Sequence, residues 1–159
     1  MPDNTAVLLL GSNIQPGENI QKCIKLLENK VQIVDVSSAW KTKAVGSEGP
    51  DFLNAALKIN TSLSREELKS KILSEVENQL GRKRTEDKYA PRTIDVDIII
   101  FNKEILDENF WKCVFIALPA SELEPEIRHP KYNISLADIV KKITNSANVE
   151  LVKDFQLRI

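Results

Sequence analysis

The sequence predicts an α+β domain of ferredoxin-like βαββαβ order, in which helices pack on an antiparallel sheet. Two observations lead to this class. Segments with strand and helix patterns follow one another as strand, helix, strand, strand, helix, strand over residues 6–101. No repeat, low-complexity stretch or linker divides the 159 residues, so we expect residues 1–159 to form a single domain around one core. In this order the helices are expected on one face of the sheet.

The first half of the chain contains three predicted strands and one predicted helix. Residues 6–10 form a continuous apolar run, which is typical of a buried central strand. Residues 18–29 place apolar side chains at helical spacing. Residues 31–43 alternate and are rich in β-branched side chains, which favours a long strand. Residues 52–61 are predicted to form the third strand.

The second helix has the clearest signals in the sequence. Ser64 and Glu67 have the spacing of a capping box, and Gly81 is a candidate C-cap. Apolar residues recur every fourth position between residues 68 and 80. Residues 94–101 are predicted to form a strand, with Val96, Ile98 and Ile100 on one face.

The last third of the chain has weaker patterns. Residues 114–118 are apolar and are predicted to form a short strand. Residues 136–143 are predicted to form a helix entered at Ser135. Residues 150–157 are predicted to form an edge strand.

Composition limits the classes of function. The formal net charge is −1, which does not favour a nucleic-acid partner. The apolar run at residues 6–10 is far shorter than the roughly 20 residues that span a membrane, and no secretory signal pattern is found. Cys23 and Cys113 lie far apart and have no zinc-site spacing, so we expect two free thiols in a cytoplasmic protein. Composition does not define the oligomeric state, although a monomer is favoured.

Two aspartates two positions apart are the first candidate site. Alternation along a strand places Asp95 and Asp97 on the same face, with their Cα atoms about 6.5 Å apart. Like charges so close repel each other, and a divalent cation between them would relieve this cost. Mg²⁺ is commonly held by one or two carboxylates together with substrate phosphates, and two metal ions can clamp a phosphoryl transfer. The alternative is a solvated pair on an exposed strand.

The segment before this strand is rich in lysine and arginine side chains. Arginine side chains bind phosphate oxygens bidentately, so cations beside carboxylates fit nucleotide phosphoryl transfer. A solvated basic loop paired with Glu86 and Asp87 is the alternative. Neither the GxxxxGK[ST] nor the GxGxxG motif occurs, so side chains and metal ions would have to hold ATP. The cations are Arg82, Lys83, Arg84, Lys88 and Arg92.

Four pieces of the chain resemble the 6-hydroxymethyl-7,8-dihydropterin pyrophosphokinases, a family of folate-biosynthesis enzymes with a ferredoxin-like fold. The pieces are residues 10–13 (LGSN), 50–56 (PDFLNAA), 80–82 (LGR) and 90–97 (APRTIDVD). The last piece is quite specific to the family. The resemblance implies transfer of pyrophosphate from ATP to a reduced hydroxymethylpterin, with release of AMP.

The resemblance also implies roles for individual residues. Asp95 and Asp97 would hold two Mg²⁺ ions that bridge the ATP phosphates, and Arg82 and Arg92 would be catalytic. Arg82, Arg84 and Arg92 would lie at the ATP phosphates. The nearby cations Lys88 and Lys112 are also expected to bind the nucleotide, although the family pattern itself does not supply them.

The pterin site is implied in the same way. Phe52 and Phe115 would sandwich the ring, and Asn54 would hydrogen-bond its edge. Thr42 and Val45 would present backbone groups to the ring. Instead of binding the pterin, the two phenylalanines could pack in the core and Asn54 could stabilise a turn.

The chain departs from the family pattern around the nucleotide site. Lys88 and Tyr89 stand where family members usually carry arginine and tryptophan. The segment after Phe101 lacks the family's Pro-His piece, and Cys113 stands where an arginine is usual. Lys112 is the nearest cation, although lysine does not reproduce the arginine fork.

Three functional hypotheses follow. The first is an active pyrophosphokinase, and the second is a catalytically weakened or inactive pterin-binding paralogue. The third is an RNA-binding module, because ferredoxin-like folds have many functions. No aromatic RNA-binding motif supports the third.

Overall fold

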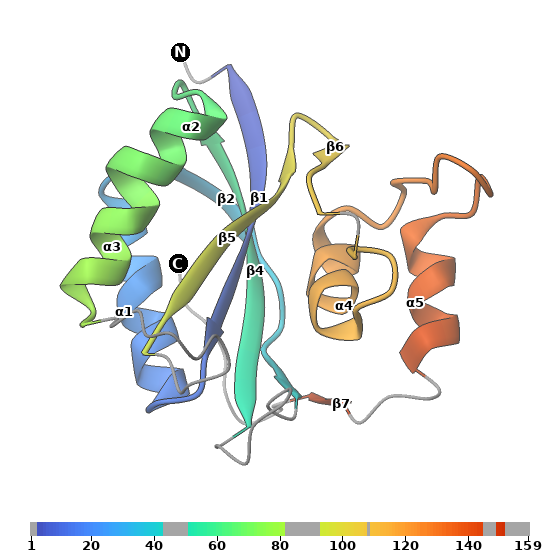
Figure 1. The fold of residues 1–159 in the computed structure, drawn as a ribbon, viewed down its shortest axis with the longest axis horizontal. Helices are drawn as coiled ribbons and strands as arrows, with labels where there is room; N and C mark the ends of the chain where they lie inside the picture. The colour runs from blue at the N-terminus through green and yellow to red at the C-terminus, as the bar shows by residue number, and fades with distance from the viewer. Residues whose placement is uncertain (1–2, 43–50, 82–92, 108, 145–148, 152–159) are drawn as a thin grey trace.

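The computed structural model describes residues 3–42, 51–81, 93–107, 109–144 and 149–151. A single seven-stranded sheet organises these residues (Figure 1). The strands are β1 (Asn4–Ser12), β2 (Gln32–Val36), β3 (Trp40–Thr42), β4 (Phe52–Thr61), β5 (Asp95–Phe101), β6 (Glu104–Ile105) and β7 (Val149–Leu151). The helical segments are α1 (Pro16–Glu28), α2 (Arg65–Glu67), η1 (Leu68–Leu73), α3 (Ser74–Gln79), α4 (Val114–Leu123) and α5 (Leu136–Thr144).

The strand order confirms the predicted fold class. The strands lie in the order β6-β5-β1-β4-β3-β7, and β2 also pairs with β4. Every described pairing is antiparallel. β1 is therefore central, as its continuous apolar run predicts. The predicted strand over residues 150–157 begins as β7, and residues 152–159 lie outside the described part. That residues 1–159 form a single domain stays a prediction.

Helices cover both faces of the sheet, whereas one face was expected. On the first face, α1 and α3 pack on Leu8, Leu10 and Leu57. On the second face, α4 and α5 pack on Leu9 and Ala56. Figure 1 shows the two helical layers on opposite sides of the strands. The expectation was wrong because residues 114–118 belong to a helix and not to a strand.

The apolar run before Pro119 shows why that strand prediction failed. Residues 116–120 are all buried within α4, so the helix lacks a polar face at these positions. A short apolar run of this kind cannot be assigned to a helix or a strand from periodicity alone. The helix predicted at residues 136–143 is confirmed as α5, and the Ser135 side chain accepts a hydrogen bond from the Asp138 backbone N–H at 3.3 Å.

The long strand predicted over residues 31–43 is divided into β2 and β3. The register with β4 shifts between Ile33 and Asp35, so Val34 interrupts the alternation. Ile33 and Val36 both pack on the first face as a result. At the break, Ser37 keeps the chain attached to β4, because its backbone N–H and its hydroxyl bond the backbone of Ala56.

A similar irregularity changes the facing of β5. Val96 and Ile98 lie on the first face as predicted, but Ile100 joins Ile99 on the second face. The cause is a register shift against β1, where Leu8 pairs with Ile98 and the next β1 pair uses Ile100. The prediction that Ile100 shares a face with Val96 was therefore wrong.

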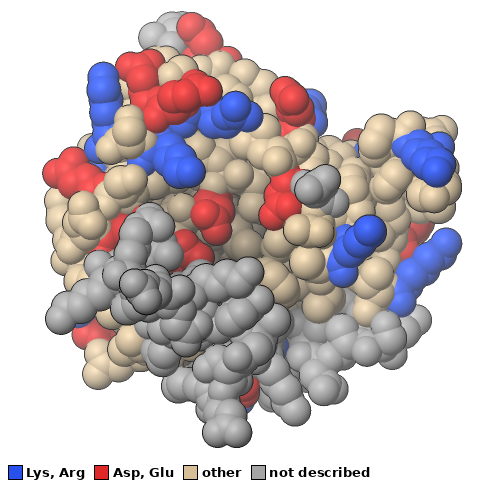
Figure 2. All heavy atoms as spheres, in the orientation of Figure 1, with Lys and Arg blue, Asp and Glu red and all other residues tan. Residues whose placement is uncertain are grey.

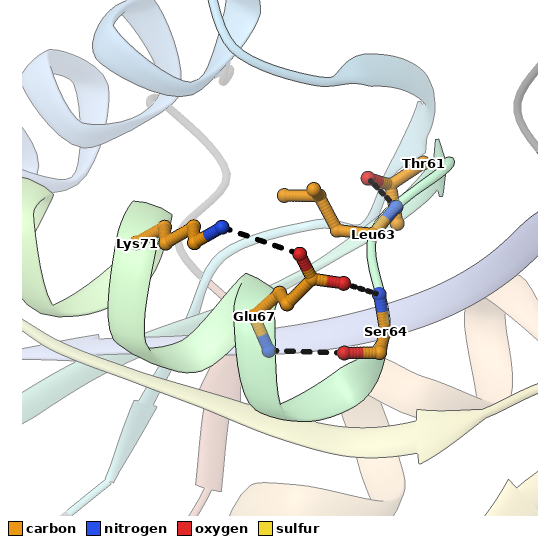
Figure 3. Close-up of polar contacts among 5 residues, drawn as sticks. All are labelled: Thr61, Leu63, Ser64, Glu67 and Lys71. Carbon is orange, nitrogen blue, oxygen red and sulfur yellow. Dashed lines mark hydrogen bonds and ion pairs between the residues drawn. The ribbon is translucent and has the colours of Figure 1, made fainter.

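The helix predicted after Ser64 begins with the expected capping box (Figure 3). The Ser64 hydroxyl accepts from the Glu67 N–H at 3.2 Å, and the Glu67 carboxylate accepts from the Ser64 N–H at 3.3 Å. These hydrogen bonds and an ion pair with Lys71 hold the pKa of Glu67 below its usual value. The helix ends at Gln79 with Leu80 as its C-cap, and Gly81 follows with a φ of 78°, the left-handed conformation that commonly terminates helices.

Candidate active site

The predicted metal ligands lie side by side on the second face of the sheet. β5 pairs with β1 so that Asp95 is opposite Gly11 and Asp97 is opposite Leu9. Residues opposite each other on paired strands share a face, so both carboxylates lie on the face that carries Leu9. Asp95 is half-buried and Asp97 is exposed. The predicted common facing of the two aspartates is confirmed.

The next strand adds the predicted pterin ligands to the same row. On the other side of β1, Gly11 is opposite Asn54 and Leu9 is opposite Ala56. Asn54 is almost fully buried. Phe52 lies two residues earlier in β4, so alternation places it on the same face. The row Asn54, Gly11 and Asp95 therefore crosses three adjacent strands.

Gly11 leaves room for its neighbours in this row. A Cβ atom at position 11 would lie 3.1 Å from Asn54 Oδ1 and 3.9 Å from Phe52 Cδ1. The Asn54 amide and the Phe52 ring therefore lie against the Gly11 backbone. The LGSN piece was recognised from the sequence, but the close approach of these two side chains to its glycine was not foreseen.

The remaining predicted pterin ligands surround this row. Thr42 is opposite Phe52 in the β3–β4 pair, which places its backbone at the same end of the sheet. Phe115 lies in the first turn of α4 and packs against the cluster that contains Leu9 and Ala56. Phe52 and Phe115 therefore belong to the same side of the sheet. Val45 lies outside the described residues.

The predicted nucleotide ligands are mostly outside the described residues as well. Arg82, Arg84, Lys88 and Arg92 belong to residues 82–92, which join Gly81 to Thr93. Their roles stay predictions. Lys112 is exposed in the turn before α4. Among the described residues on the face in Figure 2, acidic and basic side chains are interspersed.

Cys113 is the N-cap of α4. Its backbone carbonyl accepts from the N–H groups of Ile116 and Ala117. The thiol is free and half-buried, and its pKa is raised by burial and by the nearby charge of Asp107. Such a thiol stays neutral and supplies no cation.

The donor set of the aspartate pair fits a metal ion that is shared with a substrate. Within the described residues, no three His, Cys, Asp or Glu side chains converge as a metal cluster. Two carboxylates on one face match the way Mg²⁺ is held together with phosphate oxygens. Two residues before Asp95, the hydroxyl of Thr93 is buried without a hydrogen-bond partner, and it is the one such side-chain atom in the described part.

The comparisons with known proteins decide the family. Residues 7–125 match the family model described as 7,8-dihydro-6-hydroxymethylpterin-pyrophosphokinase (HPPK). This chain belongs to the HPPK family. The match confirms the family predicted from the four sequence pieces.

Curated relatives agree with this assignment. The 2-amino-4-hydroxy-6-hydroxymethyldihydropteridine pyrophosphokinase of Aquifex aeolicus is 36% identical over 146 residues, which cover 84% of this chain and 89% of the relative. The enzyme of the same name from Bacillus subtilis is 35% identical over 133 residues, covering 76% and 78%. These relatives confirm the predicted class of enzyme and do not favour an RNA-binding module.

Solved HPPK structures share the fold. A crystal structure of Plasmodium falciparum HPPK-DHPS with pteroate matches with a TM-score of 0.70 at 13% identity. The match covers 89% of this chain and 42% of the other. At this identity the likeness concerns the fold alone. Within the described residues, no helix is long and apolar enough to cross a membrane.

Proposed function

We propose that this chain transfers pyrophosphate from ATP to 6-hydroxymethyl-7,8-dihydropterin with the residues of the second sheet face. The observation that carries the proposal is the row of Asn54, Gly11 and Asp95 across β4, β1 and β5, with Asp97 beside it. This row brings a buried amide next to a pair of carboxylates. A pterin presents hydrogen-bonding groups along its edge, whereas ATP presents phosphates.

The pterin is proposed to bind over Gly11. The Asn54 amide lies against the Gly11 backbone and would hydrogen-bond the edge of the ring. Phe52 and Phe115 would form the two walls of the slot, and Thr42 and Val45 would offer backbone groups. An aromatic slot suits a planar ring because stacking adds to the free energy gained from burial.

The aspartates are proposed to hold Mg²⁺ together with the ATP phosphates. Bound there, Mg²⁺ would neutralise charge on the phosphoryl oxygens. Asp95 and Asp97 would hold the ion at β5. Arg82 and Arg92 would be the catalytic cations, and Arg84, Lys88 and Lys112 would contribute to nucleotide binding.

The proposed reaction joins the two substrates directly. The hydroxymethyl oxygen of the pterin attacks the β-phosphorus of ATP, and its proton is released to solvent. The bond between the β-phosphorus and the oxygen bridging to the α-phosphorus breaks, and AMP leaves. The chain therefore acts by positioning the two substrates and by stabilising charge, which is the usual basis of phosphoryl transfer. We place the reaction in the cytoplasm, where the free thiols Cys23 and Cys113 would remain reduced.

The test is AMP formation by the purified protein with Mg²⁺, ATP and the reduced hydroxymethylpterin. Pterin-dependent AMP is expected, and Asp97→Ala should lower kcat/KM by about a thousandfold because a metal ligand is worth several kcal/mol. Glu104→Ala removes an exposed carboxylate from the same sheet and serves as the matched control.

Three results would contradict the proposal. AMP formation at the same rate with and without the pterin would exclude the pterin as the acceptor. Equal activity of Asp97→Ala and Glu104→Ala would exclude the metal role of Asp97. Pterin binding without turnover would support the alternative of an inactive paralogue.

A further inference from the structure

One buried carboxylate has no role in the proposed reaction. Glu77 lies on α3 and is 4% exposed. Its Oε2 atom accepts a hydrogen bond from the backbone N–H of Val96 at 3.0 Å. Burying a carboxylate is costly unless it is hydrogen-bonded, so this bond helps to keep Glu77 in its place. Figure 1 shows α3 beside β5.

The position of the bond on β5 is informative. Val96 lies between Asp95 and Asp97, the proposed metal ligands. β1 pairs with β5 along one edge, whereas β6 on the other edge reaches only Ile100 and Phe101. In the described part of the chain, the Glu77 carboxylate thus accepts the Val96 N–H hydrogen bond that a neighbouring strand would otherwise accept.

This contact bears on the register of β5. N–H groups along a strand point alternately to its two edges, so fixing the outward N–H of Val96 also fixes which residues bond toward β1. A slip of one residue would move both carboxylates to the opposite face. Glu77 thus opposes a one-residue slip, which would remove the aspartate pair from the face of the Gly11 row.

The helix is built so that Glu77 reaches this position. Leu68 and Leu73 are both fully buried although they lie five residues apart. In a regular α-helix this spacing would separate them by about 140° around the axis. The π-helical segment η1 brings them onto one face, and Val76 and Glu77 continue that buried face toward β5.

We propose that Glu77 is a positioning residue that holds the two metal-binding aspartates on the substrate face through the backbone of Val96. This inference rests on the proposed function, because it takes Asp95 and Asp97 to be the metal ligands. Outer groups that orient metal ligands commonly change metal affinity by about 10- to 100-fold when they are removed.

The experiment compares four variants of the full chain. Glu77→Met keeps the length of the side chain and removes the acceptor. Glu77→Gln keeps a neutral acceptor. Glu75→Met alters an exposed glutamate of the same helix and is the matched control. Asp97→Asn serves as the reference for loss of a direct ligand.

Two quantities are measured. NMR hydrogen exchange reports the protection of the Val96 amide in the ligand-free protein. Calorimetry reports Mn²⁺ affinity in the presence of a non-hydrolysable ATP analogue. For Glu77→Met we expect about tenfold faster exchange at Val96 and about tenfold weaker Mn²⁺ binding. Glu77→Gln and Glu75→Met should stay within about threefold of the unaltered protein in both.

The outcomes separate this inference from the proposed function. Faster exchange at Val96 with unchanged Mn²⁺ affinity would overturn the positioning role. Unchanged exchange would show that the hydrogen bond does not hold β5. If Glu77→Met does not fold, a loss of Mn²⁺ affinity above about tenfold in Glu77→Gln would overturn the inference, because charge and not the hydrogen bond would then matter. Unchanged Mn²⁺ affinity in Asp97→Asn would instead refute the metal site of the proposed function.

Discussion

The two faces of the sheet differ in how completely helices cover them. On the first face, α1 and α3 pack over aliphatic side chains of the central strands, among them Leu8, Leu10 and Leu57, which are fully buried. On the second face, α4 and α5 pack over Leu9 and Ala56, and the same strands carry polar residues toward one end.

The difference follows from alternation along a few strands. In β5, Val96 lies in the first core, whereas its neighbours Asp95 and Asp97 lie on the second face. In β4, Leu53 lies in the first core and Asn54 on the second face. Each strand thus contributes to the core and to the site with adjacent residues, so stability and activity should be separable by face.

Leu57→Ala tests the first face and has the largest expected effect on stability. Leu57 is fully buried, so truncation should lower the free energy of unfolding by about 2–5 kcal/mol. Chemical denaturation measures this loss. The kcat of the protein that remains folded should stay within about twofold, because Leu57 points away from the site. A large fall in kcat without a loss of stability would refute the separation of the faces.

Gly11→Ala tests the second face. The added Cβ would lie 3.1 Å from Asn54 Oδ1, so the amide must move. We expect pterin affinity to fall by about tenfold, as for one lost hydrogen bond in a buried site, with little change in ATP affinity. Calorimetry with each ligand measures this.

A double-mutant cycle provides the control for Gly11→Ala. If the alanine acts through Asn54, the pair Gly11→Ala and Asn54→Ala should bind the pterin no more weakly than Asn54→Ala alone. Additive losses would show that Gly11 acts independently of Asn54.

The sequence predicted the first face better than the second. The core on this face follows from apolar patterns, which predicted β1 and α1 at the positions where they are found. The capping box at Ser64 was predicted from the Ser-Glu spacing and is also present. The errors arose where packing decided the outcome. Residues 114–118 are apolar on all sides because α4 is buried, and the bulge at Val34 depends on the pairing with β4.

Within the site, motifs located the ligands but not their supports. Asp95, Asp97, Asn54 and Phe52 were found from their pattern and family pieces, and the structure places them on one face. Glu77 was missed because a glutamate beside a helical apolar stripe normally lies in solvent. The π-helical segment, which no sequence period indicated, brings Leu68 and Leu73 onto one buried face, and Glu77 follows one α-helical turn after Leu73.

The two thiols extend the comparison to pH. Burial, and to a smaller extent the charge of Glu77, raise the pKa of Cys23 on the first face to about 12. The unfolded thiol ionises near 9.0 while the folded thiol stays neutral, so stability is fully present below pH 9 and falls as pH rises toward 12.

Cys23→Ala should remove this alkaline loss. Between pH 8 and pH 10 the unaltered protein should lose roughly 1 kcal/mol more stability than the variant. Urea unfolding at each pH measures the difference, in which titration of lysine and tyrosine cancels. Equal alkaline losses in the two proteins would show that Cys23 ionises as readily when folded as when unfolded.

Thr93→Val has the smallest expected effect and probes the border between core and site. The Thr93 hydroxyl is buried without a hydrogen-bond partner, and valine has nearly the same shape. A buried unpaired polar group is destabilising, so the variant should be more stable by about 1 kcal/mol in the absence of ligands. If the hydroxyl gains its partner when substrate binds, ATP with Mg²⁺ should stabilise the variant less than the unaltered protein. Thermal unfolding with and without nucleotide measures both effects. A variant that is less stable without ligand would show that the hydroxyl is already paired in the free protein and belongs to the core.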